Sequence, residues 1–162
     1  MQPSMTTATR ASLVPTRGAA EDTTEVTLTL TVAGQLCGVP VSAVRDVLAA
    51  QSITRIPLAP LEVAGGLNLR GRIVTAIDLR RRLGLPAREG GVAMSVVVER
   101  EGEAYSLLAD QVGEVLPLPR GDRAPNPPTL DPAWREVSLG VHRLGERLLI
   151  MLDVEQLLAI AA

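Results

Sequence analysis

The sequence predicts an all-β protein with short helices, folded as two similar β-barrel subdomains of about five strands each. Many short segments have the apolar pattern of strands, and glycines or prolines separate them. Part of this pattern recurs later in the chain, which indicates an internal repeat. The 162 residues, of which 46% are hydrophobic, suffice for one domain or for two small subdomains that share a core.

The N-terminal half begins with the clearest half-buried strand. From Glu25 to Val32 apolar residues alternate with polar ones, so one face is expected to be buried and the other exposed. A turn at Ala33–Gln35 and a returning strand at Leu36–Val41 predict a hairpin. Ser42 opens a brief amphipathic segment, and Ile53–Ile56 is predicted to be a short strand closed by prolines.

A central stretch, Val63–Pro86, organises the rest of the chain. It holds a Gly-Gly pair and an Asn-Leu-Arg-Gly turn. A buried strand is predicted at Ile73–Ile77, which is too short for a helix and rich in β-branched residues. Asp78 is placed to cap a short Arg-rich helix, and Gly84 with Pro86 supplies its end.

The C-terminal half predicts further strands, a long loop and a closing helix. Asp153 is expected to cap this helix, which runs to about Ala161. The proline-rich segment Pro117–Pro132 is expected to be a long loop. The predicted strands are Val92–Val98, Ala104–Ala109, Val112–Leu116, Val137–Val141 and Arg147–Leu152.

The internal repeat consists of two matched pairs of segments in the same order. Gly34–Leu48 matches Gly102–Leu116 without a gap, and both end in the pattern Val-x-acid-Val-Leu. Arg72–Leu79 matches Arg147–Val154, and both combine a strand, an aspartate and a helix start. The repeat predicts two similar subdomains.

These patterns set the expected domain boundaries. We expect a disordered leader over residues 1–22, without the apolar region of a secretory signal, and one domain over residues 23–161. The repeat divides that domain into subdomains at about 23–88 and 89–161.

Composition argues against most catalytic chemistry. The chain has one cysteine (Cys37), one histidine (His142) and no lysine, so a disulfide, a zinc cluster, a Schiff base and the usual histidine-based sites have no residues to form them. No nucleotide-binding glycine motif or G-x-S-x-G elbow is present. Asp78 and Asp153 occupy equivalent repeat positions, where helix capping is the expected role. We therefore expect no catalytic site, no metal and no cofactor.

The arginines leave two interpretations open. Six of them lie between Arg70 and Arg88, which suggests either a nucleic-acid patch or, for Arg80–Arg82, the solvated face of a short helix. Arg70 lies in a glycine-flanked turn, where it either reaches a partner or forms an intramolecular salt bridge. A net charge of −2 and only two aromatic residues argue against nucleic acid. One of those two, Trp134, is expected to plug a gap under the proline-rich loop.

The central motif resembles that of a known family. Gly65-x-x-Asn68-Leu69-Arg70-Gly71, followed by an apolar strand and Asp78-Leu79-Arg80, is similar to the signature of the CheW family of bacterial chemotaxis adaptors. The resemblance covers about residues 25–160 and includes the ending GVHRLGERLLIMLDVEQLL. The chain departs from the family at Thr75, where proline is usual, and at Cys37, where an aromatic residue is usual.

The resemblance implies two five-stranded SH3-like β-barrels and a non-catalytic role. The implied partners are the cytoplasmic tip of a methyl-accepting chemotaxis receptor and the regulatory domain of the histidine kinase CheA. A cytoplasmic protein is implied, recruited to receptor arrays without direct membrane contact and without nucleic acid. The residues that the motif places at or near the receptor-facing groove are Val44, Asp46, Gly65, Asn68 and Arg70.

Two alternatives remain open on sequence alone. One is a CheW-like scaffold in a non-flagellar sensory or pilus-motility pathway. The other, of a different class, is a small-barrel nucleic-acid-binding protein that uses the arginine patch.

Overall fold

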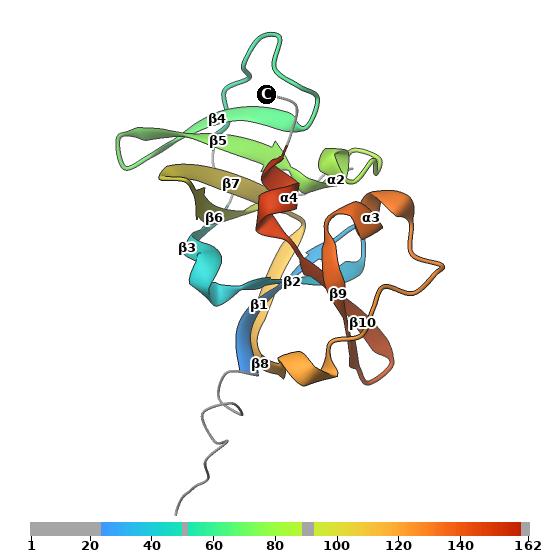
Figure 1. Cartoon of the computed structure of the whole chain (residues 1–162). Helices are drawn as coiled ribbons and strands as arrows, with labels where there is room; N and C mark the ends of the chain where they lie inside the picture. Colours follow the sequence, from blue (N-terminus) through green and yellow to red (C-terminus); the bar gives the residue numbers. More distant parts are fainter. Residues whose placement is uncertain (1–23, 50–51, 89–92, 160–162) are drawn as a thin grey trace, which may run out of the picture.

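The computed structural model describes residues 24–49, 52–88 and 93–159, and the predicted leader 1–22 lies outside them. Ten strands and five short helices make up this part of the chain (Figure 1). The strands are β1 Thr24–Val32, β2 Gln35–Pro40, β3 Val44–Leu48, β4 Val63–Leu69, β5 Arg72–Asp78, β6 Met94–Arg100, β7 Glu103–Ala109, β8 Gln111–Pro119, β9 Ser138–Leu144 and β10 Arg147–Leu152. The helices are η1 Val41–Ala43, α2 Leu79–Arg82, η2 Arg120–Asp122, α3 Pro132–Glu136 and α4 Val154–Leu158.

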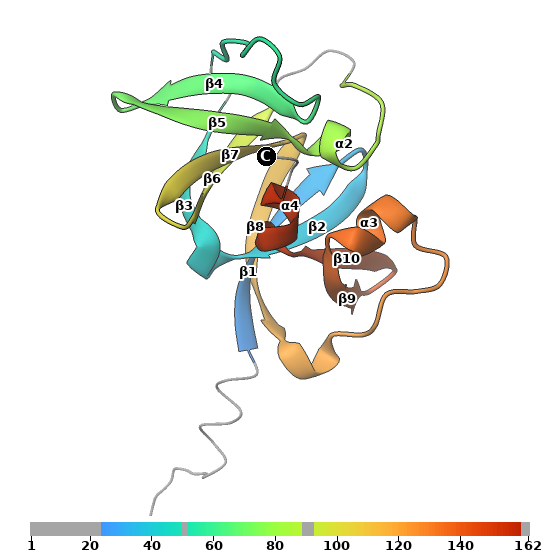
Figure 2. The ribbon, with the colours of Figure 1, turned by 45° about the horizontal axis from the view of Figure 1, so that its top comes forward.

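The strands form two five-stranded sheets, which confirms the predicted fold class. The first sheet has the order β8-β1-β2-β10-β9, and the second has the order β3-β6-β7-β5-β4. In both views the second sheet lies above the first, with α4 between them (Figures 1 and 2). The two edges of the second sheet approach each other, since an ion pair joins Asp46 on the edge strand β3 to Arg70 beside the other edge strand β4.

The two sheets do not coincide with the segments on either side of residues 88/89, because the two halves of the chain exchange strands. The hairpin β1–β2 belongs to the N-terminal half but pairs with β8 and β10 of the C-terminal half. Reciprocally, the hairpin β6–β7 pairs with β3 and β5 of the N-terminal half. Each sheet therefore contains strands from both halves, and neither sheet is a continuous segment.

The internal repeat is confirmed down to the register of its strands. In the first sheet the parallel pair β2–β10 aligns Cys37 with Ile150. In the second sheet the parallel pair β7–β5 aligns Tyr105 with Thr75. These are equivalent residues in the repeat, so the two halves are related by an approximate two-fold arrangement.

The strand and loop boundaries differ from the sequence prediction in three places. The amphipathic segment after Ser42 is the strand β3. Ile53–Ile56 contributes only a single bridge, between Thr54 and Gly66. The proline-rich loop is shorter than predicted, because β8 continues through Pro119. This is possible because β8 is an edge strand, where proline costs no ladder hydrogen bond.

One shared core joins the two sheets. Its fully buried members come from both sheets and from α2 and α4, and include Leu30, Leu79, Val98, Ile150 and Leu157. Each sheet also has a small core of its own, around Met151 in the first and Val74 in the second. Trp134 is 7% exposed and packs into the shared core from α3, which confirms its predicted place under the loop.

The two predicted helix caps are confirmed. Asp78 accepts a hydrogen bond from the Arg80 amide at 3.0 Å, and Asp153 accepts one from the Glu155 amide at 3.0 Å. Both aspartates follow a buried strand, and each satisfies amides at the start of a helix that would otherwise lack a partner.

The arginines of α2 do not form a solvated face, contrary to prediction. The Arg82 side chain is 11% exposed and donates to the carbonyl oxygens of Gln156 and Leu157, which end α4. Arg80 is 19% exposed and binds Asp110, and only Arg81 is largely solvated. Helix α2 thus fastens the second sheet to α4 and to the start of β8.

Asp110 accepts most of the hydrogen bonds that join α2 to the start of β8. It lies between β7 and β8, where the chain crosses from the second sheet to the first, and it is 17% exposed. Its carboxylate accepts hydrogen bonds from Arg80 at 2.7 and 3.0 Å, from Arg88 at 2.8 and 3.0 Å and from the Ala33 amide at 2.7 Å. We call this set the Asp110 clamp. These bonds, that from Arg80 foremost, hold the pKa of the Asp110 carboxyl well below its usual range despite its burial.

The clamp predicts a specific pH dependence of stability. Because the folded-state pKa of Asp110 is lowered, its stabilisation is complete above the unfolded pKa of about 3.9 and is lost as pH falls through the folded pKa. Asp110→Asn should lower the free energy of unfolding by about 2–3 kcal/mol at pH 7. Urea titrations at pH 7, 5 and 3 should show the difference shrinking only below about pH 4. A difference that is constant over this range would contradict the clamp's ionised state.

Candidate partner-binding groove

A shallow apolar groove lies where the two sheets meet. The cavity has a volume of about 190 Å³. One wall comes from β1 and β8 of the first sheet. The other wall comes from β3 of the second sheet and from η1, which precedes β3 in the chain. Three of the lining side chains are notably exposed for valines: Val41 at 36%, Val47 at 38% and Val115 at 52%. The complete lining is Leu28, Val41, Val44, Arg45, Asp46, Val47 and Val115.

The groove lies on the approximate two-fold axis of the repeat. Val47 and Val115 are equivalent residues of the Val-x-acid-Val-Leu pattern, and both line the groove. Val115 pairs with Leu28 on β1, and Val47 pairs with Val96, the repeat equivalent of Leu28, on β6. A register shift follows at the same place in both strand pairs. The same local structure therefore builds both walls.

Two of the predicted site residues line this groove. Val44 is the first residue of β3 and is half-buried, and Asp46 follows at the register shift of the same strand. Val41, Val47 and Val115 complete the apolar lining but are missed by motif reasoning. The repeat already contained the signal for two of them, because it aligns Val47 with Val115.

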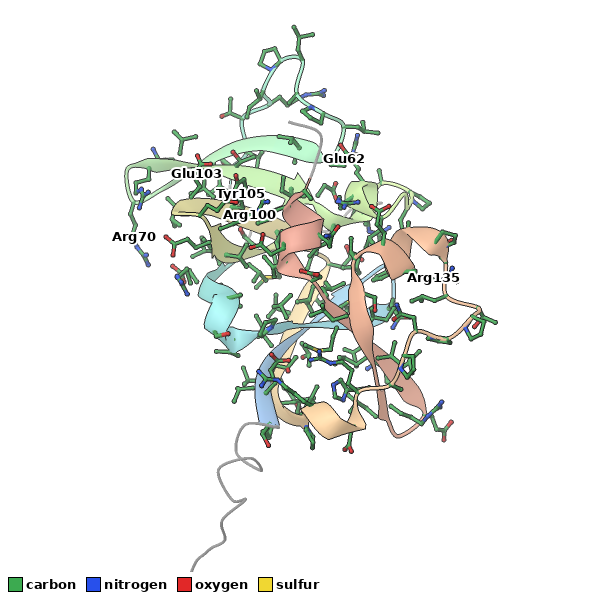
Figure 3. The ribbon with its side chains drawn as sticks, viewed as in Figure 1. Glu62, Arg70, Arg100, Glu103, Tyr105 and Arg135 are labelled. Atoms are coloured by element: carbon green, nitrogen blue, oxygen red, sulfur yellow. The ribbon has the colours of Figure 1, made fainter. Side chains whose placement is uncertain are left out.

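Arg70 forms the intramolecular salt bridge that the sequence left as one of two options. Its guanidinium lies 3.0 Å from the Asp46 carboxylate, within the same sheet. Figure 3 shows Arg70 at the tip of the β4–β5 hairpin, pointing toward the β3 side. The Arg70 side chain remains 76% exposed, whereas that of Asp46 is 25% exposed. The ion pair therefore holds the Arg70 guanidinium beside the groove while most of the side chain stays accessible.

The turn that carries Arg70 explains the neighbouring residues. Arg70 and Gly71 both have positive φ, 52° and 86°, as a two-residue hairpin turn of type I′ requires. Asn68 is exposed, and its side-chain oxygen accepts a hydrogen bond from the Gly71 amide at 2.9 Å. Asn68 thus stabilises the turn, and the turn conformation orients the Arg70 side chain.

Gly65 is buried in β4 with a φ of 149°, and a Cβ there would overlap the carbonyl oxygen of Thr54. Gly65 therefore lets the segment around Thr54 lie against β4, as the Thr54–Gly66 bridge requires. It does not line the groove described above.

A second apolar surface lies on the connection between β3 and β4. Leu58 is fully exposed with a strained φ of 63°, and Leu61 is 69% exposed. Ile56 and Ile73 are also exposed and lie together, because both approach the position that a Cβ on Gly66 would take. We call these four residues the loop patch.

The loop patch has a positive rim and is separate from the groove. Arg55 and Arg72 flank it, both are exposed, and neither forms an ion pair with an acid among residues 24–49, 52–88 and 93–159. Both views place the connection beyond β4, on the opposite side of the second sheet from β1 and β8 (Figures 1 and 2). The molecule therefore has two apolar surfaces at different places.

The titratable residues outside these surfaces are accounted for by packing. Burial raises the pKa of the Cys37 thiol, which is fully buried, so this group is protonated and unreactive at neutral pH. Burial, together with the positive charge of Arg123, lowers the pKa of His142. Within the described part of the chain, no three histidine, cysteine or acidic side chains are grouped to hold a metal ion. No helix in that part is long and apolar enough to cross a membrane.

Comparison with known proteins assigns the chain to a family. Residues 27–162 match the CheW-like domain. The chain belongs to the CheW-like family. It is 31% identical over 133 residues to the chemotaxis protein CheW of Klebsiella aerogenes, covering 82% of this chain and 80% of the relative. It is 29% identical over 118 residues to the CheW of Rhizobium meliloti, covering 72% and 76% of the two chains.

The fold agrees with a solved CheW structure. The crystal structure of the scaffolding protein TtCheW from Thermoanaerobacter tengcongensis matches with a TM-score of 0.74 and 29% sequence identity. The match covers 84% of this chain and 93% of that one. The departures at Thr75 and Cys37 are thus compatible with the CheW fold, and both residues lie in the repeat-related parallel pairs described above.

Gly65 provides a test of the β4 packing. Gly65→Ala should lower the free energy of unfolding by about 2–4 kcal/mol, because the new methyl group meets the Thr54 carbonyl at an unfavourable φ. Gly34→Ala is the matched control, since Gly34 also has a positive φ (83°) but opens onto free space, and it should lose only about 1 kcal/mol. Equal losses in urea titrations would contradict the close-packing role of Gly65.

The exposed ion pair provides a second test. Arg70→Glu puts two like charges side by side but at the surface, so the free energy of unfolding should fall by about 1 kcal/mol or less. Thermal denaturation at low and high salt should show the loss becoming smaller as salt screens the repulsion. A loss of several kcal/mol would mean that Arg70 is a structural residue and not a contact residue.

Proposed function

We propose that this protein is a non-catalytic adaptor that couples methyl-accepting chemotaxis receptors to the histidine kinase CheA. The observation that carries the proposal is the apolar groove at the seam of the two sheets, with the accessible Arg70–Asp46 pair beside it. Exposed valines next to an accessible charged pair are suited to binding a protein segment.

The groove is proposed as the receptor surface. Receptor tips are helical in the chemotaxis family, and an amphipathic helix binds a groove by inserting apolar side chains at spacings of three and four residues. Val44, Val47 and Val115 would receive those side chains, and Arg70 would bind an acidic residue at the edge of the helix. Gly65 and Asn68, the other two predicted residues, would act indirectly by holding β4 and the turn.

The loop patch is proposed as the surface for the kinase regulatory domain. An adaptor that joins two proteins needs two surfaces that are occupied together. Four exposed apolar residues with the exposed cations Arg55 and Arg72 nearby favour a partner surface that is apolar with acidic residues around it. The strained, fully exposed Leu58 has the character of an anchoring residue.

Signal transfer in this proposal involves no chemical step by the adaptor. The state of the receptor would bias the activity of the kinase through differential contacts to the bound adaptor, which is a coupling of two binding equilibria. The proposed place of action is the cytoplasmic side of receptor arrays, reached through the two partners without direct contact with the membrane.

The alternatives are separated by different observations. A related scaffold role in a non-flagellar sensory or pilus-motility pathway would use the same two surfaces, so only the identity of the partners distinguishes it. A nucleic-acid role is less well supported, because Arg80, Arg82 and Arg88 are engaged inside the molecule. Salt-dependent retention on a polyanion column would favour it nevertheless.

The two surfaces predict separable binding defects. In calorimetric titrations with a receptor-tip fragment, Arg70→Glu and Val47→Asp should each raise Kd by about tenfold or more. With the kinase regulatory domain, Leu58→Asp should do the same while leaving receptor binding unchanged.

A matched control is available on a third surface. Leu139 on β9 is an exposed apolar residue, at 45%, that belongs to neither the groove nor the loop patch, so Leu139→Asp should change neither affinity. Failure of the well-folded parent protein to bind either partner would refute the adaptor proposal. Defects that do not separate by surface would refute the assignment of partners to surfaces.

A further inference from the structure

We propose that the Asp110 clamp is the positioning device that sets the geometry of the groove, so that Asp110 and Arg88 control partner binding without touching the partner. The consequence for binding rests on the proposed receptor function, whereas the effect on geometry does not.

On one side the clamp holds the groove wall of the first sheet. Asp110 directly precedes β8, and its amide donates to the Thr31 carbonyl of β1 at 3.0 Å. Its carboxylate also accepts from the Ala33 amide in the β1–β2 turn. The groove residues Leu28 and Val115 are the paired positions farther along these same two strands. Asp110 is therefore rigidly tied to this wall.

On the other side the clamp holds the second sheet. Arg80 belongs to α2, which directly follows β5, and Arg88 lies on the segment that follows α2. Arg80 also donates to the Pro86 carbonyl at 3.1 Å, which fixes the position of that segment. The second sheet carries β3, whose Val44 and Val47 form the opposite groove wall. The carboxylate thus connects the first sheet to α2 and the segment after it through directional hydrogen bonds, and β3 is reached from there across β5, β7 and β6.

The chain itself crosses between the sheets at η1 and at Asp110, so each groove wall is also joined covalently to the other sheet. The shared apolar core attracts the sheets but is not directional. Arg82 and Arg100 make charged links between the second sheet and α4, which is not a groove element. At the repeat position equivalent to Asp110 stands Ser42, which has no carboxylate. The clamp therefore occurs at only one of the two repeat-equivalent positions. Its loss should let the angle between the two sheets vary.

A second carboxylate in the molecule serves as a matched control. Glu25 also binds two arginines, Arg120 at 3.2 Å and Arg123 at 2.7 Å, and its side chain is 17% exposed like that of Asp110. All the elements of this second cluster, however, lie at the β1–β8 end of the first sheet. Glu25→Gln should cost stability as Asp110→Asn does, but it should leave the arrangement of the two sheets unchanged.

The test measures the distance between the sheets and partner binding in the same variants. Spin labels on cysteines at Arg72→Cys of β5 and Arg143→Cys of β9 report on the two sheets, and the native Cys37 is fully buried. Pulsed electron resonance should give one narrow distance for the parent and for Glu25→Gln. Asp110→Asn, and the milder Arg88→Gln, should shift or broaden the distance by about 2 Å or more.

Binding supplies the second readout. For a receptor-tip fragment, Asp110→Asn should raise Kd by about fivefold or more, and Glu25→Gln should not. Unchanged distances in Asp110→Asn and Arg88→Gln, or an equal change in Glu25→Gln, would overturn the positioning role. If distances change as expected while the parent itself does not bind the fragment, the clamp stands and the receptor function fails.

Discussion

The exchange of hairpins between the two halves of the chain is the constraint on which the rest of this structure depends. Each sheet is completed only when the first hairpin of one half pairs in parallel with the last strand of the other, as Cys37 does with Ile150 and Tyr105 with Thr75. Neither half can bury its apolar face alone, so the two sheets must form around one shared core. The CheW-like fold is therefore a single cooperative unit despite its two sheets.

The functional features lie where the exchanged strands cross. At this seam β3 and β8 leave their own hairpins for the other sheet, and their equivalent residues Val47 and Val115 face the same groove. The crossing also places Asp110 between two arginines of the second sheet and an amide of the first. A directional polar clamp near an otherwise apolar seam gives the groove a defined shape, which binding by preorganisation requires. The loop patch, by contrast, lies away from the seam, and its most exposed residue, Leu58, has a positive φ of 63°.

The sequence allowed prediction of those features that local patterns encode. The positions of strands such as β1 and β5, the caps at Asp78 and Asp153 and the repeat itself follow from periodicity and residue chemistry. The expected exposure of the polar face of β1 was wrong, because Thr27 and Thr29 are buried in the structure. The exchange of strands was not predictable, because pairing partners are set by contacts distant in sequence. The motif containing Gly65 suggested a contact site. Only the fold shows that the absence of a Cβ at Gly65 lets the Thr54 carbonyl approach β4. The groove valines could not be identified without the fold, since Val115 comes next to the strand of Val44 only where the two sheets meet.

The central claim is that the groove and the loop patch serve two partners at once. The most direct measurement is calorimetric titration of a receptor-tip fragment into this protein after saturation with the CheA regulatory domain. Independent surfaces predict binding with the same stoichiometry and an unweakened Kd, together with a ternary complex of one copy of each in sedimentation analysis. Displacement of the kinase domain by the receptor fragment would contradict the account, because the two partners would then share one surface and the protein could not bridge them.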